Sequence, residues 1–274
     1  MPELPDVAVM QRRLAETVVG QAIVAVDAAA DYVVDGSLAF FERSLVGRTI
    51  TDVRRHGAWL IVELDGQPLL PTAAVPPAIV VSFGSRGHAL AVQDERLAPA
   101  DWSMRLHLRG GQIVSFDYTK PIGRFVLAKA GSAAHLAELE AGPDALDPAL
   151  TLDVFVGRMA GRTGPVKQHI TDSRLVAGIG AIYSDEILYQ ARLHPQTPVE
   201  SLSQADLQAI YEAMQESLRV AIEHEGNPKQ LPDWMLTRMR VSNCRQNPES
   251  GMTFTKVMIA GMTSYFDPEL QKLR

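Results

Sequence analysis

The sequence predicts an α+β protein, in which an N-terminal helix and a two-layer β-sandwich precede a helical domain and a C-terminal β-hairpin. Three observations support this prediction. Helical apolar spacing follows the N-terminus, short β-type runs continue to about residue 130, and helical spacing then resumes until a final hairpin pattern. We expect domains at residues 1–131, 132–238 and 239–274.

The first element is a predicted helix over residues 6–19. Asp6 is the expected N-cap, and Gly20 ends the pattern. Four apolar residues fall on one side at helical spacing: Val7, Met10, Leu14 and Val18. An amphipathic helix therefore leads into the first domain.

Eight short apolar runs predict the strands of the sandwich. Gly110 and Gly111 join two of them as a hairpin, and the proline-rich stretch LLPTAAVPPA predicts a loop between two others. The runs are AIVAV, ITDV, AWLIVEL, AIVVSF, HALAV, RLHLR, QIVSF and RFVLA.

Beyond the connector GPDALDPAL the pattern becomes helical. We expect helices over residues 152–160, 166–174, 184–191 and 204–225, and a hairpin over residues 252–266. The chain contains no internal repeat and no low-complexity tract.

The composition is that of a globular protein with a full core, since 46% of the 274 residues are apolar and 21% are charged. Cys244 is the only cysteine, which excludes an internal disulfide framework and a cysteine-rich zinc cluster. The first twenty residues hold five charged side chains and no apolar block, and no stretch has the length and apolar character of a membrane span. We expect a cytoplasmic protein.

The charge distribution leaves a nucleic-acid partner open. A net charge of −6 argues against such a partner, because a basic excess is the usual electrostatic footprint. Residues 229–256 nevertheless hold five basic residues against two acids: Lys229, Arg238, Arg240, Arg245 and Lys256. This strip either faces phosphate or is an ordinary solvated surface.

The chain begins MPELPD, and removal of Met1 would leave Pro2 with a secondary amine at the terminus. A terminal amine has a pKa of about 7.7 to 8.0, so roughly a tenth of it is an unprotonated nucleophile at neutral pH. Such an amine can act as a nucleophile and form a covalent intermediate. The alternative is a loose terminal tail.

A second signal is the string RLVAGIGAIYSDEILYQARLHP. Gly178 and Gly180 bracket a turn between two helical stretches, where missing side chains let backbone N–H groups approach an anion such as a DNA phosphate. The same two glycines are also consistent with a tight helix connection.

Together with the motifs RRHGAWLIVEL, SFGSRG and LEAGPDAL, these two segments make nearly the whole chain resemble the formamidopyrimidine-DNA glycosylase and endonuclease VIII family of base-excision repair. The resemblance implies a helix-two-turn-helix, damaged or distorted DNA as the partner, a monomer, and no cofactor. It also implies DNA glycosylase and AP lyase activity, in which Pro2 attacks the sugar C1′ and Glu3 handles protons. The alternatives are a catalytically impaired protein that binds DNA damage and an interaction protein that no longer binds DNA.

Six residues are candidate DNA contacts by this resemblance and by charge: Lys167, Gly178, Gly180, Arg124, Arg240 and Lys256. Lys167 matches a family lysine that faces DNA, although the alternative is a simply solvated lysine. Arg124, in the loop KPIGRF, is a displaced candidate for an intercalating residue.

Four family positions carry a different residue here. Ala58, Ala181 and Met262 replace residues that contact phosphate, and Ser85 replaces a methionine that fills the gap left by a flipped base. Each lost hydrogen bond to a charged group costs about 1.5 to 3 kcal/mol. We therefore expect weak binding to intact duplex and better binding to DNA that is already opened.

The positions of the family's four zinc-binding cysteines carry Asn247, Ser250, Asp267 and Leu270. Because structural zinc sites use cysteine and histidine ligands, we expect no metal and a zincless hairpin that is held by packing. Cys244 lies three residues before the first of these positions and is expected to be inert.

Overall fold

The computed structural model describes residues 2–29, 37–118, 123–241 and 246–273. Met1, residues 120–122 of the KPIGRF loop, Cys244 and Arg245 lie outside these ranges. The chain divides into two compact units. Unit 1 comprises residues 1–2 and 6–140, and unit 2 comprises residues 3–5 and 141–274.

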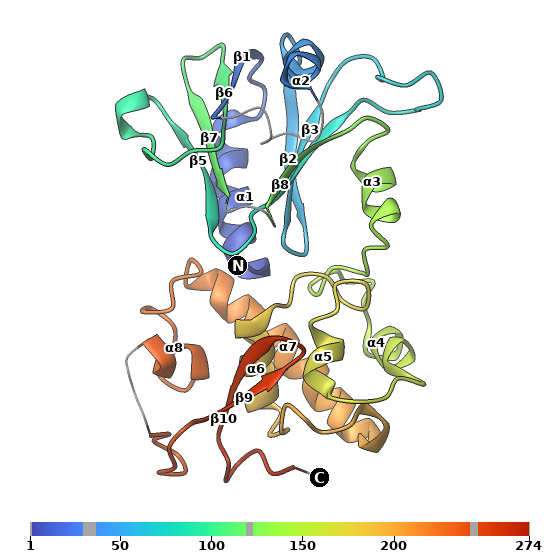
Figure 1. Ribbon diagram of the computed structural model, residues 1–274, viewed down its shortest axis with the longest axis vertical. Helices are drawn as coiled ribbons and strands as arrows, with labels where there is room; N and C mark the ends of the chain where they lie inside the picture. The colour runs from blue at the N-terminus through green and yellow to red at the C-terminus, as the bar shows by residue number, and fades with distance from the viewer. Residues whose placement is uncertain (1, 30–36, 119–122, 242–245, 274) are drawn as a thin grey trace. The chain divides into compact units, whose positions relative to one another are not determined.

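Unit 1 is a two-layer sandwich of antiparallel sheets (Figure 1). The first sheet has the order β1-β6-β7-β5, with β1 (Ile23–Ala28), β6 (Met104–Leu108), β7 (Ile113–Tyr118) and β5 (Gly87–Val92). The second has the order β2-β3-β4-β8, with β2 (Ile50–His56), β3 (Trp59–Leu64), β4 (Ala78–Ser82) and β8 (Arg124–Ala128). Each of the eight predicted apolar runs coincides with a strand.

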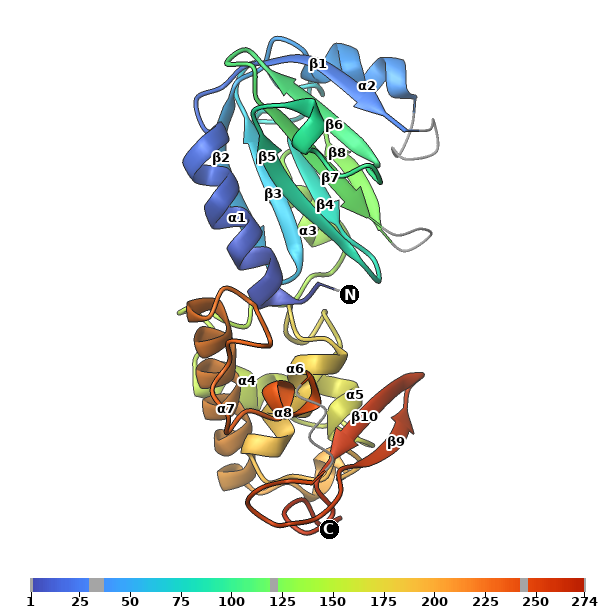
Figure 2. The ribbon, with the colours of Figure 1, turned by 90° about the vertical axis from the view of Figure 1, so that its left-hand side faces the viewer.

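Helix α1 (Leu4–Val18) lies along the sandwich (Figure 2) and completes its core. Its buried Val7 and Leu14 belong to the same apolar cluster as Phe116 and Phe125, whose ring centroids are 5.1 Å apart. The helix begins at Leu4, so Asp6 lies in its first turn and is not the predicted N-cap.

Two short helices of unit 1 were not expected from the sequence. The α2 helix (Leu38–Leu45) buries Phe41 in the sandwich core, and α3 (Ser132–Glu138) packs on β4 and β8. Each has only about two turns, too few for a sustained helical period. Because α3 packs on the second sheet, unit 1 continues to Glu140, beyond the predicted boundary at residue 131.

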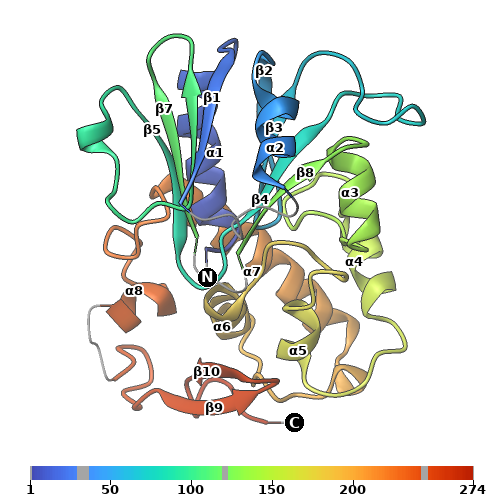
Figure 3. The ribbon, with the colours of Figure 1, turned by 45° about the horizontal axis from the view of Figure 1, so that its top comes forward.

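Unit 2 contains five α-helices within the described residues and a C-terminal hairpin: α4 (Leu152–Met159), α5 (Val166–Ile170), α6 (Ala181–Gln190), α7 (Gln204–Glu223), α8 (Leu236–Val241), β9 (Thr255–Ile259) and β10 (Met262–Phe266). Three-residue 3-10 turns lie at Glu95–Leu97 in unit 1 and at Val199–Ser201 in unit 2. Strand β10 packs on α6 (Figure 3). The hairpin is therefore part of unit 2, and the separate domain predicted for residues 239–274 is not found.

The core of unit 2 lies where α6 packs against α7. Ile187 and Leu188 of α6 are fully buried in one cluster with Met214 and Leu218 of α7. Among the described residues, no helix has both the length and the apolar character needed to cross a bilayer.

Candidate active site

Glu3 is buried at the N-terminus of α6, where its carboxylate is bound by the first amides of the helix. Its Oε2 accepts hydrogen bonds from the backbone N–H groups of Gly180 at 2.8 Å and Tyr183 at 3.0 Å, and its Oε1 accepts one from Ile182 at 2.8 Å. These N–H groups have no partner within the helix and carry partial positive charge. The helix end therefore fixes the position of the Glu3 carboxylate.

The turn that precedes α6 is shaped around Glu3. Gly178 has a φ of 111°, and its carbonyl accepts the N–H of Leu4 at 2.9 Å. A Cβ atom on Gly180 would lie 2.6 Å from Cδ of Glu3, so only glycine fits there. The predicted phosphate contact of the Gly180 amide is wrong, because Glu3 already accepts that hydrogen bond. The predicted contact of Gly178 stays a prediction.

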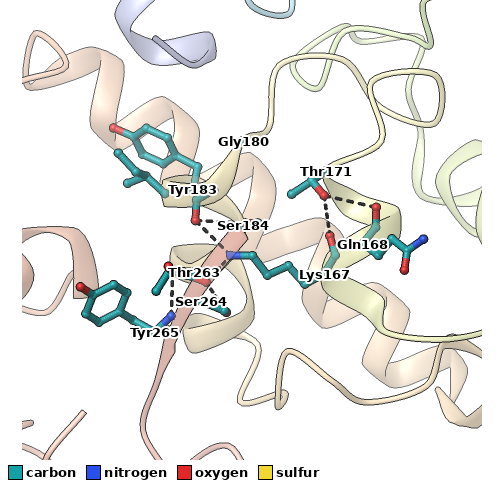
Figure 4. A network of polar contacts seen from close by, with 12 residues as sticks. Lys167, Gln168, Thr171, Gly180, Tyr183, Ser184, Thr263, Ser264 and Tyr265 are labelled. Carbon is teal, nitrogen blue, oxygen red and sulfur yellow. Dashed lines mark hydrogen bonds and ion pairs between the residues drawn. The ribbon is translucent and has the colours of Figure 1, made fainter. Parts of the chain in front are cut away.

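Lys167 of α5 is fully buried, which contradicts both the DNA-facing and the solvated position considered for it. Its Nζ forms an ion pair with Asp185 and donates a hydrogen bond to the carbonyl of Ala181 at 3.1 Å (Figure 4). Burial lowers the pKa of Lys167, although the charge of Asp185 opposes this shift. The charge of Lys167 therefore balances the charge of the buried Asp185 carboxylate.

Asp185 is the centre of a polar network that was not predicted from the sequence. Besides Lys167, its carboxylate accepts hydrogen bonds from Ser264 Oγ at 2.6 Å, from the N–H of Tyr265 at 2.9 Å, and from Arg240 at 3.2 Å. Strand β10 and helices α5 and α8 are thereby joined to α6.

A second buried acid, Glu186, positions α8. Its carboxylate accepts the backbone N–H groups of Leu236 at 3.2 Å and Thr237 at 2.7 Å, and burial raises its pKa. The sequence signal for both acids is the pair Asp185 and Glu186 within an otherwise apolar helical stretch, because unpaired charges are rarely placed inside a core.

Two cations gather on the ring of Tyr265 in β10. The guanidinium of Arg240 lies 4.0 Å from the ring centroid, and Nζ of Lys256 lies 4.9 Å from it. Lys256 is exposed, and Arg240 is partly exposed. These two predicted DNA contacts are therefore brought together at one place on the hairpin.

The other sequence-predicted positions are placed as follows. Pro2 is half-buried, Arg124 is exposed at the first position of β8, and Ser85 is exposed in the turn between β4 and β5. The three positions that lack a phosphate-binding side chain lie at a hairpin turn, a helix start and a strand start: Ala58, Ala181 and Met262.

The four positions that correspond to zinc ligands lie together and are joined by hydrogen bonds. Asp267 Oδ2 accepts a hydrogen bond from Asn247 Nδ2 at 2.7 Å and another from the Ser250 hydroxyl, and Asp267 Oδ1 accepts the N–H of Leu270 at 3.0 Å. The expected packing is also present, because Leu270 packs against a buried apolar cluster that contains Tyr189 and Leu236. The hydrogen bonds add to this packing. We call the four residues at the zinc-ligand positions the Asp267 clasp. In the part of the chain that the structure describes, no three His, Cys, Asp or Glu side chains are grouped to hold a metal ion.

Residues 1–125 match the family model of the formamidopyrimidine-DNA glycosylase N-terminal domain, and residues 141–232 match that of the formamidopyrimidine-DNA glycosylase H2TH domain. A formamidopyrimidine-DNA glycosylase of Arabidopsis thaliana is 31% identical over 283 residues, which cover 100% of this chain and 71% of that protein. One from Streptococcus pyogenes serotype M3 is 28% identical over the full length of both chains.

The structure is also similar to solved structures of this enzyme. Lactococcus lactis formamidopyrimidine-DNA glycosylase, non-covalently bound to DNA that contains an AP site, has a TM-score of 0.83 at 20% identity, covering 98% of this chain and 99% of that one. This likeness shows the fold, and the two family models cover most of the sequence. The chain belongs to the formamidopyrimidine-DNA glycosylase family.

Proposed function

We propose that the protein is a DNA repair glycosylase with AP lyase activity, in which Pro2 is the nucleophile and Glu3 transfers protons. Family membership supports the reaction class. The observation that most directly supports the assignment of residues is the buried Glu3 carboxylate, which three backbone amides hold beside Pro2 in the sequence. A glutamate in a loose tail would have no such partners.

In the proposed reaction, the unprotonated amine of Pro2 attacks the sugar C1′ while the bond from C1′ to the damaged base breaks and the base leaves with the bonding electrons. Glu3 supplies and removes the protons that base departure and sugar-ring opening require. The product is a Schiff base between Pro2 and C1′. Loss of a C2′ proton then expels the 3′ phosphate and breaks the strand.

We further propose that Arg240 and Lys256 contact DNA phosphate. The charged groups of both side chains lie over the ring of Tyr265. Within the described residues, Lys256 has no carboxylate partner. Arg124 is a third candidate, because its side chain is exposed at the start of β8. Damaged or distorted DNA is the expected substrate, and the protein is expected to act as a monomer without a cofactor. The single cysteine supports a cytoplasmic location.

Base excision and borohydride trapping on abasic DNA together test this assignment. We expect wild type to excise an oxidised base and to form a covalent complex. Pro2→Gly should trap at least about tenfold less, and Glu3→Gln should lose excision while still binding DNA. Glu16→Gln, which changes an exposed acid on α1, is the matched control and should behave as wild type. Equal trapping by wild type and Pro2→Gly would assign the Schiff base to another amine. Binding of abasic DNA without trapping or excision by wild type would favour a DNA-damage-binding protein without turnover.

A further inference from the structure

The Asp185 carboxylate joins several elements of unit 2 but has no part in the chemistry proposed above. Its side chain is fully enclosed and accepts hydrogen bonds from Lys167, Ser264, the Tyr265 amide and Arg240. A buried carboxylate is stable only when it is paired and hydrogen-bonded. All of its partners must therefore keep their places around α6.

Lys167 extends this network to the helix turn that binds Glu3. Figure 4 shows its side chain reaching from α5 toward Ser184 of α6 and the Ser264–Tyr265 segment of β10. Its Nζ donates to the carbonyl of Ala181 at 3.1 Å, and the residues on either side of Ala181 donate their amides to Glu3. The negative charge of Glu3 also acts on the Lys167 ammonium.

We infer that Asp185 is a positioning residue for base excision: its charge is paired with Lys167 beneath the first turn of α6 and so fixes the turn that holds the Glu3 carboxylate for proton transfer. This inference rests on the proposed role of Glu3. It extends the set of residues on which excision depends to a side chain that touches neither Glu3 nor DNA.

Removing the charge of Asp185 should weaken its pairing with Lys167 without leaving a cavity. Asp185→Asn keeps the size of the side chain but leaves the buried Lys167 without its counter-charge, and burial then favours the neutral amine. A neutral amine holds the Ala181 carbonyl less firmly, because a hydrogen bond to a charged group is the stronger kind. Glu3 then loses both a nearby cation and a fixed turn.

Two reactions separate this role from a general structural one. Excision of a damaged base requires Glu3, whereas a preformed abasic site already carries an aldehyde at C1′ and needs only the Pro2 amine to form a Schiff base. Asp185→Asn should therefore lower kcat for excision of a formamidopyrimidine base from duplex DNA by roughly 30-fold, while KM and trapping on abasic DNA stay within about threefold of wild type.

Three further proteins complete the experiment. Asp185→Glu restores the charge and should recover most of the lost kcat. Asp153→Asn changes an exposed acid on α4 and should match wild type. The double variant Lys167→Met with Asp185→Leu replaces the buried pair by apolar side chains, which commonly preserves folding. It should trap abasic DNA as wild type does, but its excision of a damaged base should remain as slow as that of Asp185→Asn.

The possible failures are distinguishable. Excision by Asp185→Asn within threefold of wild type, with Glu3→Gln inactive, would overturn the inference and leave the proposed function intact. Full excision by Glu3→Gln would overturn both. If Asp185→Asn does not fold, the double variant decides, and its excision within threefold of wild type would contradict the inference.

Discussion

The Glu3 carboxylate accepts the amide hydrogen of Gly180, 177 residues later in the chain, at 2.8 Å. The interaction makes a glycine necessary at the start of α6, because a side chain at residue 180 and the carboxylate would occupy the same space. The sterics of this pair give the first prediction.

Gly180→Ala should displace Glu3 and lower base excision by at least about tenfold, with a stability cost of about 1 to 3 kcal/mol from overpacking. Activity on duplex with an oxidised base and chemical denaturation measure the two effects. Gly157→Ala on α4 is the control, because a Cβ there meets no atom within 4 Å. Wild-type excision by Gly180→Ala would show that the position of Glu3 does not matter.

The Asp267 clasp predicts a hairpin that needs no metal. Protein purified without a His-tag should contain substoichiometric zinc, and a chelator should leave its melting temperature and DNA binding unchanged. Asp267→Ala removes the acceptor of several hydrogen bonds and should destabilise the protein by about 1 to 3 kcal/mol. One equivalent of zinc per chain would contradict this prediction.

Acid should destabilise unit 2 in two steps. Burial lowers the pKa of His194. The contribution of the neutral imidazole to the free energy of unfolding is therefore complete above the unfolded pKa of about 6.5, and it is lost as the pH falls toward the lower folded pKa. Burial alone would raise the pKa of Asp267, but hydrogen bonds from Ser250, Leu270 and Asn247 outweigh it and lower the pKa. This second contribution is lost below about pH 4.

Urea denaturation between pH 8 and pH 2.5 measures both steps. His194→Asn keeps an acceptor for the N–H of Gln196, which His194 Nδ1 now accepts at 3.1 Å, and removes the titration. The loss of stability between about pH 7.5 and 5.5 should then become smaller. His224→Asn, at the C-cap of α7, is the matched control. An unchanged pH profile in His194→Asn would refute the assignment.

DNA that is already opened should be bound better than matched duplex. The side chains of Ala58, Ala181 and Met262 supply no hydrogen bond to phosphate. Compared with a protein that has all three contacts, the binding free energy for DNA should be weaker by about 5 kcal/mol or more. Affinities for matched duplex, an abasic site and a bubble over a salt series test this preference. Tight binding to matched duplex with a steep salt dependence would require phosphate contacts that these side chains cannot make.

Lys256→Gln should weaken binding to all of these DNAs alike and reduce the slope of log affinity against log salt by about one. Lys272→Gln, which changes an exposed lysine near the C-terminus, is the control. If Lys256→Gln leaves the slope unchanged, Lys256 does not contact phosphate.

The sequence predicted the strands, five helices and the hairpin because these depend on local spacing of apolar residues. The burial of Lys167 could not be predicted, because it depends on Asp185, 18 residues later, and on a strand that packs on α6. The hydrogen bonds of the Asp267 clasp could not be predicted for the same reason, since Asn247 and Asp267 are 20 residues apart. Long-range polar contacts have no periodic signature in the sequence.

The most direct test of the account is to identify the residue that forms the Schiff base. Protein should be reduced with borohydride on abasic DNA, digested, and examined by peptide mass spectrometry. We predict that the sugar remnant is attached to the N-terminal amine of Pro2, in a peptide that lacks Met1. Attachment at a lysine, or an unmodified peptide that retains Met1, would contradict the central claim.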